Sequence, residues 1–360
     1  MRVIVSAGGT GGHIYPALAI INKIKEKEPN STFLYIGTTN RMEATLIPKT
    51  DIPFVGIEMK GLNRHNIFAN FKVISCFIKG INKSSSLIKS FNPDIVLGIG
   101  GYITAPVIYA AKKLGYKTFI HEQNSIPGVS NKFLANYADK IGVSLPNSIN
   151  YFNKDKVIYT GNPRSEEVLK ALPIKKEDYG LSDSKKLVLI VMGSLGSTTM
   201  TDKLLTLVPA FKDATYEVLL VTGNDYYKDF ANLNVPSNVK VVPYLDNMLG
   251  VMKKTDLIVS RAGASTVAEI TTLGLPSILV PSPYVTHNHQ LKNALELSSK
   301  GATCILEEKD FSSTELMPLI DSILNDKVLY NSLRDNAIKL GIPDSATKIY
   351  NIIKELVGGK

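Results

Sequence analysis

The chain lacks several features that mark common classes of protein. Its 360 residues include no tryptophan and only two cysteines, Cys76 and Cys304, which lie far apart and match no C-x-x-C or zinc-ligand spacing. We therefore expect a chain from a reducing compartment, without a disulfide framework or a structural zinc site. Apolar runs stay well short of the roughly 20 residues that span a bilayer, and the N-terminal run is too short for a signal-peptide core. These absences predict a chain that is neither integral to a membrane nor exported through a signal peptide.

Common nucleotide-binding and metal-binding motifs are also missing. The chain contains no G-x-G-x-x-G and no G-K-[ST], and the segment IGTTN after the second apolar run has no acid that could bind a ribose diol. NAD binding and a P-loop are therefore disfavoured. Because no Asp-x-Asp pair is present either, we expect that no metal or cofactor is required and that any bound divalent cation is non-essential.

The charge is unevenly distributed along the chain. The formal net charge is +9, but residues 1–164 contain 20 Lys and Arg against 9 Asp and Glu, whereas the remainder contains 21 against 23. The first part therefore carries +11 and the second −2. A basic surface suits nucleic acid or anionic lipid. Because interleaved aromatic and basic motifs of the RRM or OB type are absent, we expect no nucleic acid partner.

Short apolar runs alternate with segments of helical length, and 44% of the residues are apolar. The runs predict strands at 3–6, 33–36, 54–57, 95–98, 118–121, 140–143 and 157–159, and a second series at 187–192, 217–221, 239–242, 257–260, 277–280 and 303–305. Predicted helices include 266–273 and 290–300. This alternation is typical of parallel strands joined by crossover helices. It predicts an α/β fold of two doubly wound Rossmann-like domains facing across a cleft.

A stretch with prolines and many charged and small residues separates the two series. It covers about residues 162–186 and predicts a linker. We expect a first domain of residues 1–163, a second of residues 164–341 and a terminal helix of residues 342–360. The sequence leaves open which domain the terminal helix joins, and packing back onto the first domain is one alternative.

Glycine-rich turns follow three predicted strands. The first glycine loop is GGTGGH at residues 8–13, before a helix that is predicted to begin near Tyr15 and Pro16. The second is GIGGYITAP at 98–106 and the third is GSLGS at 193–197. Glycine lets backbone N–H groups approach a negative ligand closely, although each loop alone is equally a plain tight turn. Three such loops at the carboxyl ends of parallel strands predict a substrate that carries phosphate.

Polar side chains follow other predicted strands. HEQN at 121–124 is either part of a substrate site or a hydrogen-bonded loop cluster. In SRAGASTVAE, Glu269 lies early in a helix, where a carboxylate binds a ribose diol or offsets the helix dipole. HNHQLKN at 287–293 gathers imidazole and amide groups that suit sugar hydroxyls. These segments are typical of a site for a nucleotide and a sugar.

Seven segments, in order and across essentially the whole chain, resemble one family. They are GGTGGHIYPALAI, GGYITAPV, HEQNSIPG, GNPR, GSLG, SRAGASTVAEI and HNHQLKNA. The chain is similar at these segments to the MurG family of bacterial UDP-N-acetylglucosamine (UDP-GlcNAc) transferases, which convert lipid I to lipid II in peptidoglycan synthesis. The resemblance implies a GT-B enzyme. Its first domain would bind the acceptor, undecaprenyl-pyrophosphoryl-MurNAc-pentapeptide, and its second domain would bind most of UDP-GlcNAc.

The resemblance also implies donor-binding residues. They are the Leu245 backbone for uracil, Glu269 for the ribose, Ser194, Ala264, Ser265 and Thr266 for the diphosphate, and His289, Gln290 and the supporting Asn293 for the sugar hydroxyls. Arg164 or Arg261 would stabilise the leaving UDP. The chain departs from the family pattern where GNPR replaces GNPVR and displaces Arg164 by one residue. It also has Leu195 and His289 where some members have Gln, which weakens two side-chain contacts.

In the first domain, the resemblance implies an acceptor site at the first glycine loop. Thr10, Gly11 and Gly12 would line it, and Asn124 would reach the GlcNAc. His13 would accept the proton of the attacking hydroxyl, or would only orient the loop. The implied reaction is attack of the MurNAc 4-hydroxyl on C1 of GlcNAc, with inversion to the β anomer and release of UDP.

A basic segment at residues 67–91 mixes aliphatic and aromatic residues with lysines and contains no acid. It suits a helix that lies on an anionic bilayer, with Lys72, Lys79, Lys83 and Lys89 toward the lipid headgroups. The alternative is an ordinary crossover helix with a solvated basic face. With the implied lipid substrate, the segment predicts a peripheral protein on the cytoplasmic face of the cell membrane.

Other functions remain open. A UDP-GlcNAc 2-epimerase or a transferase for a soluble acceptor would share the nucleotide site, and a non-enzymatic sugar or nucleotide binding protein would share the two domains. The HEQN and GGYITAP segments favour the lipid-linked acceptor, and His13 in the first glycine loop favours an enzyme.

Overall fold

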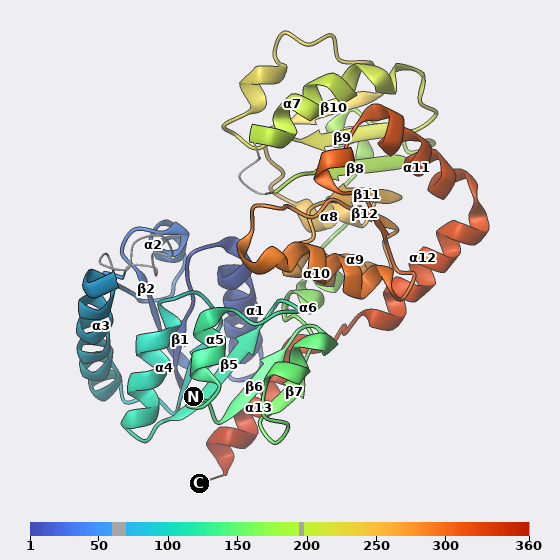
Figure 1. Ribbon diagram of the computed structural model, residues 1–360. Helices are drawn as coiled ribbons and strands as arrows, with labels where there is room; N and C mark the ends of the chain where they lie inside the picture. The colour runs from blue at the N-terminus through green and yellow to red at the C-terminus, as the bar shows by residue number, and fades with distance from the viewer. Residues whose placement is uncertain (60–69, 194–197, 360) are drawn as a thin grey trace. The chain divides into compact units, whose positions relative to one another are not determined.

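A computed structural model describes residues 1–59, 70–193 and 198–359. Of the predicted features, Ser194, Leu195 and residues 67–69 lie outside these ranges. The chain divides into two compact units (Figure 1). The first unit comprises Met1–Glu166 and Asp344–Lys360, and the second comprises Glu167–Pro343.

Within the described residues, the first unit is built on a seven-stranded parallel sheet with the order β3-β2-β1-β4-β5-β6-β7. Its strands are β1 (Arg2–Ser6), β2 (Thr32–Thr38), β3 (Phe54–Ile57), β4 (Ile95–Gly98), β5 (Lys117–Glu122), β6 (Lys140–Val143) and β7 (Val157–Tyr159). Each strand lies within about two residues of its predicted position. Continuous apolar runs are what a parallel sheet covered on both faces requires.

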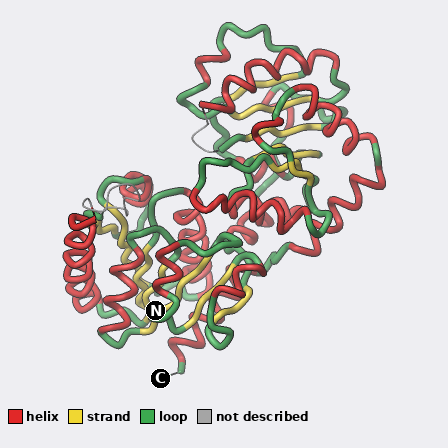
Figure 2. Tube along the Cα trace, viewed as in Figure 1, coloured by secondary structure: helices red, strands yellow, loops and turns green. Residues whose placement is uncertain are grey.

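Helices cover both faces of this sheet (Figure 2). The helices are α1 (Gly11–Lys27), α2 (Met42–Leu46), α3 (Asn70–Phe91), α4 (Thr104–Lys113), α5 (Val129–Leu134) and α13 (Ser345–Gly358). Val3 and Val5 of β1 pack in one core with α1 and α13, whereas Ile4 packs in another with α3, α4 and α5. Successive residues of one strand therefore supply two cores.

The described part of the second unit holds a six-stranded parallel sheet with the order β10-β9-β8-β11-β12-β13. Its strands are β8 (Leu187–Val191), β9 (Glu217–Val221), β10 (Val239–Val242), β11 (Leu257–Ser260), β12 (Ser277–Leu279) and β13 (Cys304–Ile305). Its helices are α7 (Thr198–Leu207), α8 (Met248–Met252), α9 (Ala264–Leu273), α10 (His289–Ser298), α11 (Ser313–Asn325) and α12 (Lys327–Leu340). The predicted class, two doubly wound α/β domains, is confirmed.

The chain passes from the first unit to the second between Glu166 and Glu167, inside α6 (Arg164–Lys170). The stretch predicted as a linker thus contains a helix, followed by a 3₁₀ turn at Lys176–Tyr179. The chain returns at Asp344, and Ile349 and Ile353 of α13 join the core beside α1. In the described ranges, none of the helices is both long and apolar enough to cross a bilayer.

Helix α1 begins at Gly11, earlier than the predicted start near Tyr15. Thr10 is its N-cap, with an extended backbone at φ −140°, and Pro16 lies inside the helix rather than in its first turn. The low helix propensity of glycine makes Gly11 and Gly12 look like loop residues in the sequence. The earlier start places His13 in the first turn of the helix.

Candidate functional site

The first two glycine loops touch at the carboxyl ends of β1 and β4, which are neighbouring strands. The Gly8 amide donates a hydrogen bond of 3.1 Å to the Gly100 carbonyl. Gly100 and Gly101 have φ of +118° and +90°, and a Cβ on Gly101 would collide with the Gly8 carbonyl. Glycine is needed here because the two loops pack backbone against backbone. Helices α1 and α4 leave β1 and β4 on opposite faces of the sheet, as at the ligand-binding switch point of doubly wound folds.

His13 lies against this junction. Its Nδ1 is 3.0 Å from the Gly8 carbonyl oxygen, and a Cβ on Gly100 would collide with its ring. Because a carbonyl oxygen can only accept, Nδ1 carries the proton of the neutral imidazole and Nε2 carries the lone pair. This is the tautomer that a general base acting through Nε2 requires.

A buried carboxylate organises the loop after β5. Glu122 accepts hydrogen bonds from the Asn124 amide at 2.9 Å, the Gly128 amide at 3.0 Å and the Asn131 side chain at 2.8 Å. The Asn124 side-chain amide lies 3.2 Å from Glu122 Oε1. Asn124, the predicted GlcNAc contact, is therefore held in place from inside the first unit.

His121 connects loops of the first unit through hydrogen bonds of its two ring nitrogens. Burial lowers the pKa of its imidazole from 6.5 to about 4, so the ring is neutral at pH 7. Its Nε2 donates to the Gly161 carbonyl at 3.0 Å, and its Nδ1 accepts from the Gln123 side chain at 3.1 Å. The Gln123 amide also donates to the Ile99 carbonyl at 2.7 Å. His121 thus joins the loops after β4, β5 and β7, and its lowered pKa makes it unsuited to act as a base.

Arg164 begins α6 near the start of α1. Its guanidinium carbon lies 5.4 Å from the centre of the Tyr15 ring, a cation–π distance. The Tyr15 ring covers Gly11, where a Cβ would come within 3.0 Å of it. Thr10 and Gly12 are exposed on either side. The predicted acceptor residues and Arg164 therefore lie together in the first unit.

The predicted donor residues follow strands of the second sheet at their carboxyl ends. Leu245 follows β10, Arg261 and the Ala264–Thr266 turn follow β11, and His289 follows β12. Leu245 and Glu269 are buried, and the Ser265 hydroxyl is covered without a hydrogen-bond partner among the described residues. This edge of the sheet is where doubly wound domains bind nucleotides.

Arg261 forms a buried ion pair with Glu308. Its Nη2 lies 2.6 Å from Glu308 Oε2, with the two side chains 9% and 6% exposed, and its Nη1 donates to the Val280 carbonyl at 3.1 Å. The Thr199 hydroxyl donates to Glu308 Oε1 at 2.6 Å. The charge of Arg261 is therefore balanced inside the second unit, and Glu308 connects the loop after β11 to the start of α7 through Thr199.

The three residues that are predicted to contact the sugar hydroxyls also form hydrogen bonds within the second unit. Asn293 is fully buried and donates to the Ala262 carbonyl at 3.1 Å. Gln290 Oε1 accepts from the Ser282 amide at 2.8 Å, and His289 Nδ1 lies 2.9 Å from the Thr286 carbonyl. These bonds fix the start of α10 against the loops after β11 and β12.

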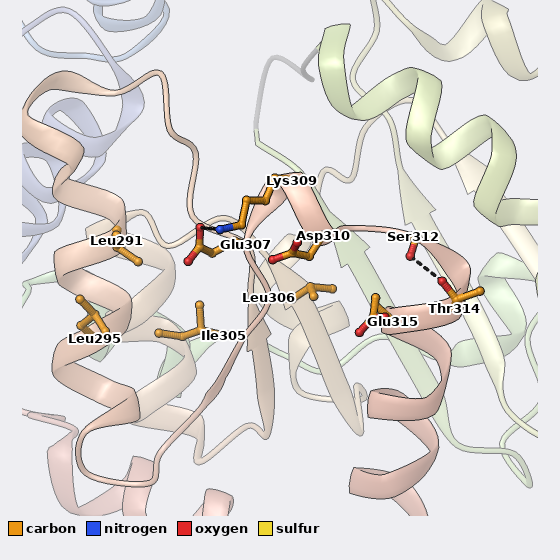
Figure 3. A pocket seen from close by; sticks show the side chains of 10 residues that line it. All are labelled: Leu291, Leu295, Ile305, Leu306, Glu307, Lys309, Asp310, Ser312, Thr314 and Glu315. Atoms are coloured by element: carbon orange, nitrogen blue, oxygen red, sulfur yellow. Dashed lines mark hydrogen bonds and ion pairs between the residues drawn. The ribbon is translucent and has the colours of Figure 1, made fainter.

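A surface pocket of the second unit lies apart from these residues. It has a volume of about 690 Å³ and opens between α10, the end of β13 and the start of α11 (Figure 3). Leu291 and Leu295 line one side and Thr314 and Glu315 the other, and an ion pair of 3.2 Å between Glu307 and Lys309 lies between the two sides. Of the predicted residues that the structure describes, none lines this pocket.

Comparison with known proteins identifies the family. Residues 3–143 match the N-terminal domain of glycosyltransferase family 28, and residues 187–354 match its C-terminal domain. A relative from Bacillus cytotoxicus is named UDP-N-acetylglucosamine–N-acetylmuramyl-(pentapeptide) pyrophosphoryl-undecaprenol N-acetylglucosamine transferase. It is 47% identical over 362 aligned residues, which cover 99% of this chain and 100% of the relative. The chain belongs to the MurG family.

Solved structures agree with membership of the MurG family. The crystal structure of Acinetobacter baumannii MurG has a TM-score of 0.78 at 27% identity, covering 98% of this chain and 99% of that one. A UDP-GlcNAc 2-epimerase from Neisseria meningitidis, bound to UDP-GlcNAc, has a TM-score of 0.69 at 17% identity, covering 99% and 100%. The epimerase shares the fold alone. The predicted resemblance to MurG, the GT-B class and the hexosyltransferase class are confirmed.

Two carboxylates that hold the loops of this MurG-family chain are absent from the predicted residues. Glu308 pairs with Arg261 in the second unit, and Glu43 bonds the first glycine loop in the first. Both partners are distant in the sequence, so no local motif marks either carboxylate. The sequence offers only a weak signal for Glu43, which lies five residues after the end of β2 in the segment TTNRMEATLI.

Proposed function

We propose that this protein transfers GlcNAc from UDP-GlcNAc to the 4-hydroxyl of MurNAc in lipid I, giving lipid II for peptidoglycan synthesis. The observation that carries the proposal is the 47% identity, over both domains, to a curated transferase with that donor and acceptor in its name. A bond forms between the acceptor oxygen and C1 of GlcNAc while the bond from C1 to UDP breaks. Attack from the opposite face gives the β anomer.

His13 is the base in this proposal. Its neutral ring carries the lone pair on Nε2, which takes the proton of the attacking hydroxyl. The Gly8 carbonyl accepts from Nδ1 before and after that transfer, so it also stabilises the imidazolium that forms. Thr10, Gly11 and Gly12 offer backbone groups beside the base for the acceptor, and Asn124 is assigned to the GlcNAc.

The donor is assigned to the second unit. Glu269 binds the ribose diol, and the Leu245 backbone binds uracil. Ser194, with the amides and dipole at the N-terminus of α9, binds the diphosphate. Arg164 or Arg261 is assigned to the leaving UDP, and Glu308 holds the Arg261 side chain in place.

Acceptor-dependent release of UDP tests this function. The protein is incubated with UDP-GlcNAc and a lipid I analogue, and we expect UDP and a disaccharide-linked product in equal amounts. An analogue without the MurNAc 4-hydroxyl is the matched control and is expected to release none. Conversion of UDP-GlcNAc without any acceptor would support the 2-epimerase instead, and no acceptor-dependent release would contradict the proposal.

We also assign the first unit to the cytoplasmic face of the cell membrane. On α3, Ile74 and Ile78 are 55% and 53% exposed and lie one turn apart. The exposed arc of the helix continues to Lys79 and Lys83. Exposed apolar side chains beside lysines suit a helix that lies on an anionic bilayer.

Substitutions on α3 are expected to weaken membrane binding. Ile78→Asp removes apolar surface and Lys79→Glu reverses a charge, so each is expected to lower co-sedimentation with phosphatidylglycerol vesicles by roughly fivefold to thirtyfold. Binding of UDP-GlcNAc is expected to stay unchanged. Val328→Asp is the matched control, because Val328 is equally apolar and 79% exposed but lies in the second unit. If both α3 variants sediment with the vesicles as the wild type does, the assignment of the first unit to the membrane surface is contradicted.

A further inference from the structure

Glu43 is a fully buried carboxylate in α2, beside the first glycine loop. Its Oε1 accepts hydrogen bonds from the Thr38 amide at 2.9 Å and the Thr38 hydroxyl at 2.6 Å. Its Oε2 accepts from the Gly9 amide at 2.9 Å. Because every partner donates, both oxygens act as acceptors, as in an ionised carboxylate. A charge buried this deeply persists only where it is hydrogen-bonded on all sides.

Two glycines make room for this carboxylate. A Cβ on Gly8 would collide with the carboxylate of Glu43, and a Cβ on Gly37 would lie 2.6 Å from its Cγ. A side chain on Gly8 would therefore have to displace the Glu43 carboxylate.

One peptide unit connects Glu43 to His13. The N–H of the Gly8–Gly9 peptide donates to Glu43, and the carbonyl of the same peptide accepts from His13 Nδ1 at 3.0 Å. The two groups lie on opposite sides of a planar, conjugated amide. A negative charge at the N–H side increases the electron density on the carbonyl oxygen, which strengthens the hydrogen bond from Nδ1.

We propose that Glu43 is a positioning residue that raises the basicity of His13 and fixes its tautomer through the Gly8–Gly9 peptide. The inference rests on the proposed function, in which His13 is the base. When Nε2 takes the proton of the acceptor hydroxyl, Nδ1 keeps its proton on the Gly8 carbonyl. Glu43 keeps its charge throughout, and no proton crosses the peptide. In serine hydrolases a carboxylate bonds Nδ1 directly, whereas here a peptide stands between them.

Other charged and titratable groups surround the loop. The elements packed there bring Tyr15, Tyr35, Arg41, Tyr102, Arg164 and the neutral His121. Burial and the neighbouring Glu43 raise the pKa of the Tyr35 hydroxyl, which donates to the Ala7 carbonyl at 3.1 Å. Arg41 Nε bonds the Tyr102 hydroxyl at 3.4 Å, and Arg164 covers the Tyr15 ring. The negative charge of Glu43 is expected to favour the imidazolium form of His13. Loss of the Glu43 charge is therefore expected to lower the pKa of His13.

Substitution of Glu43 by glutamine tests the inference, because it keeps the size of the side chain and removes its charge. The pKa of the His13 imidazole is measured by ¹⁵N NMR titration, with His13 assigned among the five histidines by a His13→Asn variant. We expect the pKa of His13 to fall by roughly half a unit to one unit in Glu43→Gln. We expect the acid limb of the pH profile of kcat/KM for GlcNAc transfer to shift to lower pH by the same amount.

Thr38→Val is the matched control. It removes one hydrogen bond to Glu43 and leaves the charge, so it is expected to lower stability without lowering the pKa of His13. Glu43→Asp draws the charge back from Gly9 and replaces Glu43→Gln if that variant does not fold, with a smaller fall expected. An unchanged pKa of His13, or a neutral wild-type ring protonated on Nε2, would overturn the inference. The NMR measurement needs no transferase activity, so its failure is distinguishable from failure of the proposed function.

Discussion

Replacement of His13 by asparagine is expected to lower kcat for GlcNAc transfer by about two to four orders of magnitude. The asparagine side-chain amide can donate to the Gly8 carbonyl in place of Nδ1, so the contact that orients the loop is kept. No atom replaces the lone pair of Nε2. The KM for UDP-GlcNAc is expected to stay within about threefold, because the donor is assigned to the second unit. Initial rates of UDP release with a lipid I analogue measure both constants.

His13→Ala separates the two interpretations of this residue. If His13 only orients the loop, His13→Asn retains activity within about tenfold of the wild type, whereas His13→Ala loses much more. If His13 is the base, the two variants lose similar activity, and the acid limb of the pH profile disappears in both. Near-normal transfer by His13→Asn would thus end its assignment as the base and leave the loop role.

The strands are the part of the fold that the sequence predicts best. In β1 and β8 successive residues pack on opposite faces of a sheet that is covered on both sides, so residues 3–5 and 187–191 are uninterrupted apolar runs. The sequence predicts too late a start for α1, because Gly11 and Gly12 have low helix propensity and the side chain of the N-cap Thr10 forms no capping hydrogen bond. The position of His13 in the first turn depends on that start.

At the candidate site, the sequence does not predict which residues pack against each other. Sequence spacing marks the glycine loops, but it assigns their glycines to a phosphate. In the structure, Gly101 packs on Gly8, and Gly8 packs on Glu43. The motif around Arg261 predicts a role at UDP, but it does not indicate the partner Glu308, which lies in a distant segment. Such pairings are created by the order of the strands in a sheet, and a local pattern contains no information about them.

Glu308→Ala is expected to destabilise the second unit by about 3–5 kcal/mol. The substitution leaves the Arg261 guanidinium buried with its charge unbalanced, and the Thr199 hydroxyl loses its acceptor. Hydrogen exchange of the β11 amides measures the loss in the second unit itself, because a two-domain chain need not unfold in one step. Arg261 also bonds the Val280 carbonyl, so the damage is expected to extend to β12.

The neighbouring residue supplies the matched control for this prediction. Glu307 also pairs with a basic side chain, Lys309, at 3.2 Å, but both side chains are largely exposed, and water screens their interaction. Glu307→Ala is therefore expected to leave exchange in β11 close to that of the wild type. Joint replacement by Arg261→Met and Glu308→Leu is expected to recover much of the stability, since it removes both buried charges together. Equal protection of β11 in Glu307→Ala and Glu308→Ala would mean that the buried pair does not stabilise the loop after β11.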